Sequence, residues 1–172
     1  MNKVCSYARV ASIIMVILMV LAFIKTDIIT IIQGYAFWIV WIIFFILLIS
    51  NAAKNSPICL PSKLGIACGI LCMTHGLILD LIEYDIIDYT KACYNALLTL
   101  SIIDILMIAA TYIILSKYFS KGSTLKVVCY ALAIGPLISD DRSFIGYGIY
   151  MIFPILFFYY FSRLKTECNE CV

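Results

Sequence analysis

Two ionisable side chains, His75 and Asp104, lie deep within two apolar segments of this 172-residue chain. His75 lies 11 residues beyond Leu64, where its segment begins, and Asp104 lies 12 residues beyond Ala92, where the next segment begins. Because neighbouring segments would cross a membrane in opposite directions, both side chains would reach the same depth, near the midplane. This placement predicts a hydrogen-bonded pair that could relay protons or bind a cationic group.

A structural role would explain the same two residues. A charge at the bilayer centre costs about 2.5–3.5 kcal/mol on insertion scales, so an intramembrane His or Asp needs a partner. A hydrogen bond between two membrane helices contributes about 0.6–2 kcal/mol and can serve only to join them. The sequence leaves both interpretations of His75 and Asp104 open.

Small residues follow one face of the segment that carries His75. They recur at steps of three and four, the helical period: Gly65, Cys68, Gly69, Cys72 and Gly76. The same period continues to Asp80 and Glu83 near the end of the segment, and the next segment offers Ser101, Asp104 and Thr111. Close helix packing through small residues is the simpler interpretation. The alternative is a cavity that opens outward, with Asp80 and Glu83 at its rim.

More carboxylates gather in the predicted outer loops, at Asp85, Asp88, Asp140 and Asp141. They could form an acidic rim that attracts cations or a basic partner by long-range electrostatics. Solvated loop residues are the simpler explanation.

Cys168 and Cys171 form a lone CxxC motif near the C-terminus. A structural zinc site needs four ligands, and although Cys5 and Cys59 could supply the other two in principle, a lone CxxC motif is a weak signal. The sequence therefore predicts no metal and no cofactor, and these cysteines stay as weak metal candidates.

Enzyme motifs are not recognisable in the chain. The sequence has no HExxH, no GxSxG and no Gly-rich phosphate loop, and its single histidine excludes sites that need two. A non-enzymatic role is therefore favoured.

The composition identifies the surroundings of these residues. The chain is 65% hydrophobic and 13% charged, whereas soluble domains are about 45–50% apolar and about 25% charged. A soluble domain of this length could not bury so much apolar surface, so the lipid bilayer is the expected partner. A net charge of +2 gives no reason to expect nucleic acid.

An all-α, polytopic membrane helix bundle of a single domain is therefore predicted, because a membrane helix needs about 20 apolar residues. Six segments qualify, at 7–24, 28–49, 64–82, 92–115, 123–139 and 144–161. The fifth is short and contains Lys126, so it crosses only if that side chain reaches the interface. The stretch from Ser50 to Lys63 contains Pro57, Pro61 and several Asn and Ser residues, and it is predicted to be a connector.

The basic residues orient these six spans, because cytoplasmic loops are enriched in Lys and Arg. Six crossings place nine basic residues on one side: Lys3, Arg9, Lys54, Lys63, Lys117, Lys121, Lys126, Arg163 and Lys165. The other side has Lys25, Lys91 and Arg142. Both termini are therefore predicted to be cytoplasmic, in the plasma (inner) membrane.

Three classes of function fit this topology. The first is binding or transport of a small molecule or ion, alone or as a transporter subunit, with the His75–Asp104 pair at the midplane. The second is a non-catalytic interaction protein, such as an immunity, assembly or regulatory factor, with other membrane proteins as partners. The third is a lipid-active intramembrane enzyme that would use carboxylates at the level of the lipid headgroups.

Overall fold

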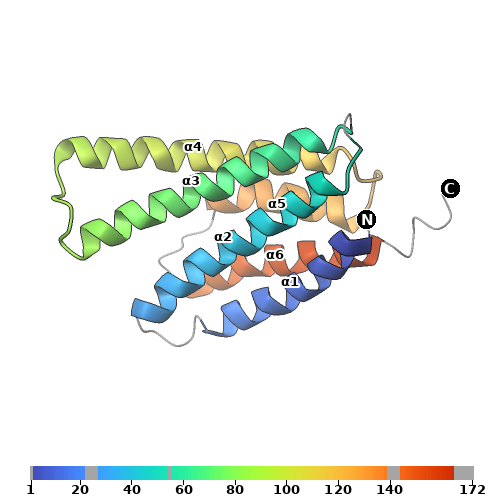
Figure 1. Ribbon diagram of the computed structural model, residues 1–172, viewed down its shortest axis with the longest axis horizontal. Helices are drawn as coiled ribbons and strands as arrows, with labels where there is room; N and C mark the ends of the chain where they lie inside the picture. Colours follow the sequence, from blue (N-terminus) through green and yellow to red (C-terminus); the bar gives the residue numbers. More distant parts are fainter. Residues whose placement is uncertain (1, 22–26, 54–55, 139–143, 165–172) are drawn as a thin grey trace.

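The computed structural model is an all-α bundle (Figure 1), and it describes residues 2–21, 27–53, 56–138 and 144–164. Within these residues there are six helices, which confirms the predicted fold class. In chain order they are α1 (Asn2–Leu21), α2 (Asp27–Ser50), α3 (Cys59–Glu83), α4 (Lys91–Ser116), α5 (Thr124–Ile138) and α6 (Phe144–Arg163).

The helices differ in how well their lengths suit a membrane. Among the described residues, α1, α2, α3 and α4 are long and apolar enough to span one. The 25 residues of α3 and the 26 of α4 correspond to about 38 Å, longer than the hydrocarbon core of about 30 Å. The 15 residues of α5 reach only about 22 Å. Crossing by α5 therefore needs local thinning of the bilayer or a Lys126 side chain that extends to the interface.

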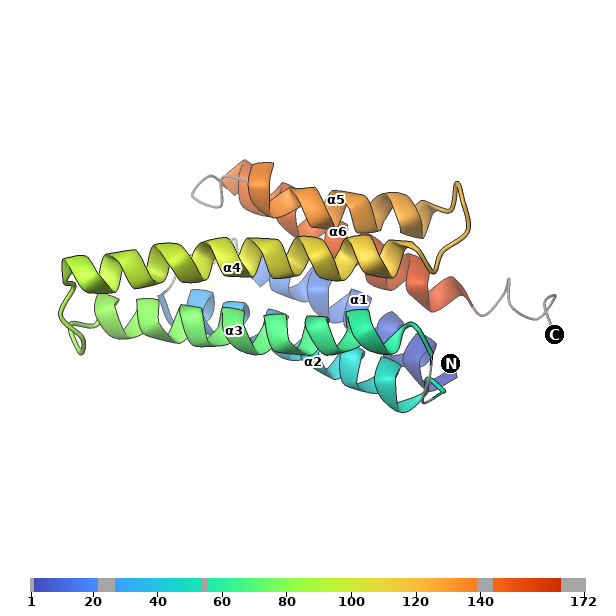
Figure 2. The ribbon, with the colours of Figure 1, turned by 90° about the horizontal axis from the view of Figure 1, so that it is seen from above.

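The helices form a closed ring. Each helix packs against its neighbours in the chain, and α1 packs against α6 to close the ring (Figures 1 and 2). α3 and α4 therefore lie side by side and antiparallel, the arrangement in which His75 and Asp104 were predicted to reach the same depth.

Aromatic side chains fill the interior of the helix bundle toward its predicted cytoplasmic end. Trp41 of α2 stacks on Phe45 with ring centroids 5.8 Å apart, and it lies 4.6 Å from the ring of Phe158 on α6. Tyr112 of α4 lies 5.5 Å from the same indole. Such pairs contribute about 0.5–1.5 kcal/mol each beyond the area they bury. They connect α2, α4 and α6, which are not neighbours in the ring.

Two glycines allow α3 to approach α2 closely. A Cβ atom at Gly69 would lie 2.6 Å from Cγ1 of Ile42, and one at Gly65 would meet the ring of Phe45. A Cβ atom at Gly76, farther along the same face of α3, would have no other atom within 4 Å. The small-residue stripe therefore packs against α2 at one end and borders open space at the other.

The α3–α4 hairpin projects beyond the rest of the bundle at its predicted outer end (Figures 1 and 2). The connection between the two helices contains Asp85 in the left-handed region, with φ 55°. The hydroxyl of Thr90 accepts a hydrogen bond from the backbone N–H of Cys93 at 3.2 Å and caps the start of α4. Beyond this cap, Leu98 and Ile102 are each about half exposed.

Two helices extend beyond the membrane spans that were predicted for them. α3 begins at Cys59, inside the stretch that was predicted to be a connector. Pro61 does not prevent this, because it lies in the first turn, where a backbone N–H has no intrahelical acceptor. α1 likewise begins at Asn2 instead of Tyr7. Helices can continue past the apolar run that defines a membrane span, so hydropathy alone misplaces their ends.

We expect Gly69→Ala to destabilise the bundle by about 1–3 kcal/mol, because an overpacked contact with Ile42 must move the helices apart. Gly76→Ala is the matched control and should be neutral or stabilising by up to about 1 kcal/mol, because alanine favours the helix and meets open space. Unfolding of the purified protein in detergent would measure both. Equal effects of the two substitutions would contradict the close α2–α3 contact.

Thiol labelling tests the orientation. In variants that retain one cysteine, a membrane-impermeant maleimide should reach Cys59, at the start of α3, only from the cytoplasmic side. Cys93, at the start of α4, should react only from the opposite side. Cys129 is fully buried and serves as the unlabelled control. Labelling of Cys59 and Cys93 from the same side would exclude the proposed topology.

Candidate functional site

His75 in α3 and Asp104 in α4 meet across the interface of the two helices. Nδ1 of His75 lies 2.7 Å from Oδ2 of Asp104. The two side chains are only 14% and 10% exposed, so the contact is shielded by the surrounding helices. When the carboxylate is ionised and the imidazole is protonated, this becomes a charge-assisted hydrogen bond, which is about twice as strong as a neutral one.

The second oxygen of Asp104 has no such partner. Oδ1 is buried and accepts no hydrogen bond from the described residues. The thiol of Cys72 lies close to the carboxylate, but a thiol is a weak donor. A buried acceptor without a donor costs about 1–3 kcal/mol, and more when it carries charge. The pair therefore keeps the capacity to take up a proton, a hydrogen-bond donor or a cation at Oδ1.

His75 also borders a hollow between α3 and α4. This space has a volume of about 560 Å³ and is lined by His75, Leu79, Tyr89, Tyr94, Leu97, Leu98 and Ser101. The hydroxyl of Ser101 donates to the carbonyl of Leu97 at 3.0 Å and retains oxygen lone pairs. The imidazole thus connects the buried carboxylate with a hollow on the surface of the bundle.

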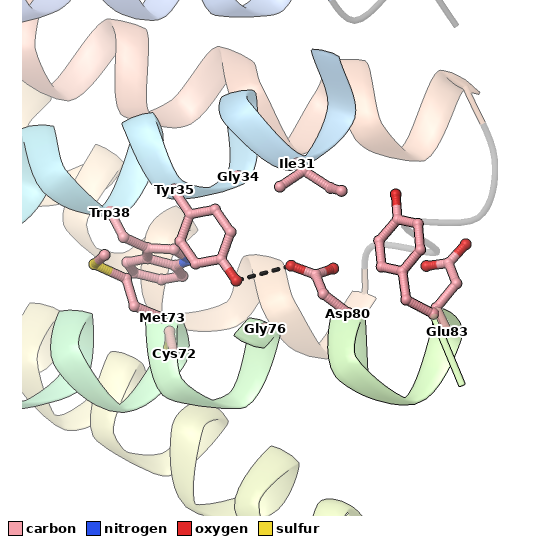
Figure 3. A pocket seen from close by; sticks show the side chains of 10 residues that line it. Ile31, Gly34, Tyr35, Trp38, Cys72, Met73, Gly76, Asp80 and Glu83 are labelled. Atoms are coloured by element: carbon pink, nitrogen blue, oxygen red, sulfur yellow. Dashed lines mark hydrogen bonds between the residues drawn. The ribbon is translucent and has the colours of Figure 1, made fainter. Parts of the chain in front are cut away.

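A separate cavity lies between α2 and α3 (Figure 3). It has a volume of about 220 Å³, and Ile31, Gly34, Tyr35, Trp38, Cys72, Met73, Gly76, Asp80, Glu83 and Tyr84 line it. The phenol of Tyr35 donates a hydrogen bond to Oδ2 of Asp80 at 2.8 Å. Glu83 lies at the end of α3, one turn beyond Asp80, while Trp38 and Met73 lie at the opposite end of the cavity.

Cys72 connects the two regions. Cys72 lines the α2–α3 cavity, and its thiol lies close to Asp104. Toward the packed end of α3, the sulfur atoms of Cys72 and Cys68 are 4.0 Å apart. Asp104 therefore lies between the α2–α3 cavity, reached past Cys72, and the α3–α4 hollow, reached past His75.

The remaining candidate residues are dispersed. Asp85 and Asp88 are exposed in the connection between α3 and α4, outside the residues that line the α2–α3 cavity. Asp140, Asp141, Cys168 and Cys171 lie outside the described residues. Within the described part of the chain, no three His, Cys, Asp or Glu side chains lie close enough together to hold a metal ion.

The sequence did not single out the contributions of α2 to the cavity. Ile31, Tyr35 and Trp38 follow steps of four and three, so they share one face of α2. This spacing is visible in the sequence, but it cannot indicate that the face lies against Asp80. Cys72 was interpreted as a small packing residue, and only the tertiary structure places it beside Asp104.

A double-mutant cycle would measure the contact between the two ionisable residues. We expect His75→Ala and Asp104→Ala to be coupled by about 0.6–2 kcal/mol in the free energy of unfolding, the range for hydrogen bonds between membrane helices. As a control, Asp104→Ala should be additive with Thr99→Ala, because Thr99 is exposed and bonds only its own helix. Additivity in the His75–Asp104 cycle would show that the two side chains do not interact.

Comparison with known proteins adds no functional assignment. No protein-family model, no curated protein and no solved structure matches this chain. The function must therefore be argued from the geometry around Asp104 and Asp80.

Proposed function

We propose that this protein binds, and in the membrane transports, a small molecule or ion between its helices, in a manner that depends on protonation of the His75–Asp104 pair. The observation that carries the proposal is the buried carboxylate of Asp104. One of its oxygens is bonded to His75 and the other accepts no hydrogen bond from the described residues. Ionisable groups held inside a membrane bundle commonly mark ion paths and proton relays.

The arrangement suggests how protonation would act. The imidazole of His75 borders the α3–α4 hollow and contacts Asp104 through Nδ1. A proton taken up by His75 from the hollow would strengthen its bond to the carboxylate, and a proton on Asp104 would remove the negative charge. Either change alters the electrostatic field at Cys72, on the wall of the α2–α3 cavity. Occupancy of that cavity and protonation of the pair would thereby be linked.

The proposal includes the cellular setting. All six helices would cross the plasma membrane, with both termini in the cytoplasm. The support is the length and apolar character of α1 to α4, the apolar character of the shorter stretches in α5 and α6, and the concentration of Lys and Arg on one side of the predicted topology.

A membrane interaction protein is the second candidate, and the outer half of α4 favours it. This part of the helix exposes Tyr94, Leu98 and Ile102 to the surroundings of the bundle. A transmembrane helix of another protein could pack against these side chains, although lipid chains would also suit them. In that case, retention of a partner should not depend on His75 or Asp104.

Mild purification followed by native mass spectrometry tests the proposed function. The wild-type protein should retain a small-molecule or ion adduct. Asp104→Asn should lose it, because the substitution removes the negative charge as protonation would, whereas the control Thr99→Ala should retain it. An adduct that survives in Asp104→Asn, or a wild-type protein that carries only a protein partner, would contradict the proposal.

A further inference from the structure

We propose that the cavity between α2 and α3 is a binding site for a small alkylammonium group, held by Asp80 and Glu83 against Tyr35, Trp38 and Tyr84. This inference goes beyond the proposed function, because it assigns a ligand to a second site whose lining does not include Asp104. Binding to the cavity does not itself require the His75–Asp104 pair.

The charge of the cavity selects a cation. Two of its ten lining residues, Asp80 and Glu83, carry carboxylates, and none is Lys, Arg or His. Tyr35 occupies Oδ2 of Asp80, and Figure 3 shows the other oxygen turned along the cavity toward Glu83. Asp80 is half-buried, so it attracts a positive charge more strongly than a carboxylate in water would, and Glu83 adds an exposed negative charge at the end of α3.

The aromatic lining favours an organic cation. The rings of Tyr35 and Trp38 from α2 line this space (Figure 3). Tyr84, which follows Glu83 in the chain, lines it as well. Aromatic faces attract alkylated ammonium groups through their quadrupoles, with about 0.5–2 kcal/mol per contact. Met73 and Ile31 add apolar surface that suits the methyl or methylene groups of such a ligand.

The size of the cavity limits the ligand. Its volume of about 220 Å³ is below the range of about 300–1,000 Å³ for drug-sized sites. Gly34 and Gly76 border it, and a Cβ at either position would meet no other atom within 4 Å. The space fits a headgroup-sized cation and would be filled by a larger side chain at Gly76.

A metal ion fits this lining less well. Ca²⁺ takes six to eight oxygen ligands, and Mg²⁺ prefers an octahedral oxygen shell. The cavity offers the carboxylates of Asp80 and Glu83 and two phenols, together with Trp, Met and Ile side chains. Aromatic and apolar walls beside two carboxylates suit a charge that is covered by carbon.

The alkylammonium group could belong to a free solute or to a lipid headgroup, since Glu83 ends α3 at the predicted outer surface. The test therefore uses nanodiscs of phosphatidylglycerol, which has no ammonium group. Choline is titrated as the free cation, and its uncharged analogue 3,3-dimethylbutan-1-ol is titrated as the control. A second arm measures by native mass spectrometry whether phosphatidylcholine is retained in preference to phosphatidylglycerol.

We expect calorimetry to show choline binding and little binding of the uncharged analogue. Asp80→Asn should weaken choline binding by about tenfold or more, because a charge-assisted contact is lost. Gly76→Leu should abolish binding by filling the cavity, and Gly135→Leu, which also meets open space but lies on α5, should leave it unchanged. If Asp80→Asn fails to fold, the comparison of Gly76→Leu with Gly135→Leu still tests the site.

The alternative outcomes are distinct. Phosphatidylcholine retention that is lost in Asp80→Asn, without binding of free choline, supports the site with a lipid as the source of the cation. Equal binding of choline and its uncharged analogue would overturn the proposal, as would displacement of choline by equimolar Ca²⁺. Absence of binding in both arms would overturn it as well. Asp104→Asn should still bind choline. Loss of choline binding would therefore contradict the α2–α3 site without bearing on the proposed function, which the adduct experiment tests.

Discussion

Every polar group that is buried in an apolar bundle needs a partner within the protein, and His75 and Asp104 meet this need only across the α3–α4 interface. Their contact of 2.7 Å fixes the relative depth of the two longest helices, because a slip by one turn would leave both groups unpaired. The arrangement of the cavities on either side of Asp104 follows from that register. A structural role and a functional role are therefore compatible in the same pair, since the contact satisfies only one oxygen of the carboxylate.

The bundle is built differently along its length. Toward the predicted cytoplasmic end, the rings around Trp41 and the close contact at Gly65 leave a cavity of only about 20 Å³. Toward the other end, the helices are less completely surrounded, and both the α2–α3 cavity and the α3–α4 hollow are found there. A packed end that holds the helices in register and a looser end that admits a ligand are consistent with a binding site entered from outside.

The two sets of carboxylates would have different tasks. Asp80 and Glu83 lie near the end of α3, where a ligand from the outer surface would arrive first. Asp104 lies deeper, beside Cys72 and His75, where a change of protonation could be sensed by an occupied cavity. The α2–α3 cavity and the His75–Asp104 pair lie close together because α3 carries Cys72, His75 and Asp80 within nine residues.

The sequence by itself determined the helical class, the approximate position of each helix and the shared depth of His75 and Asp104, because hydropathy and helical rise are local properties. It assigned the first turn of α3 to a connector, because Pro61 is typical of turns but is also tolerated in the first turn of a helix. It also left the small-residue stripe ambiguous between packing and cavity. The tertiary structure decided that question residue by residue: Gly65 and Gly69 face side chains of α2, and Gly76 faces open space. The pairing of Asp80 with Tyr35 likewise depends on how α2 and α3 are rotated against each other, which no local pattern specifies.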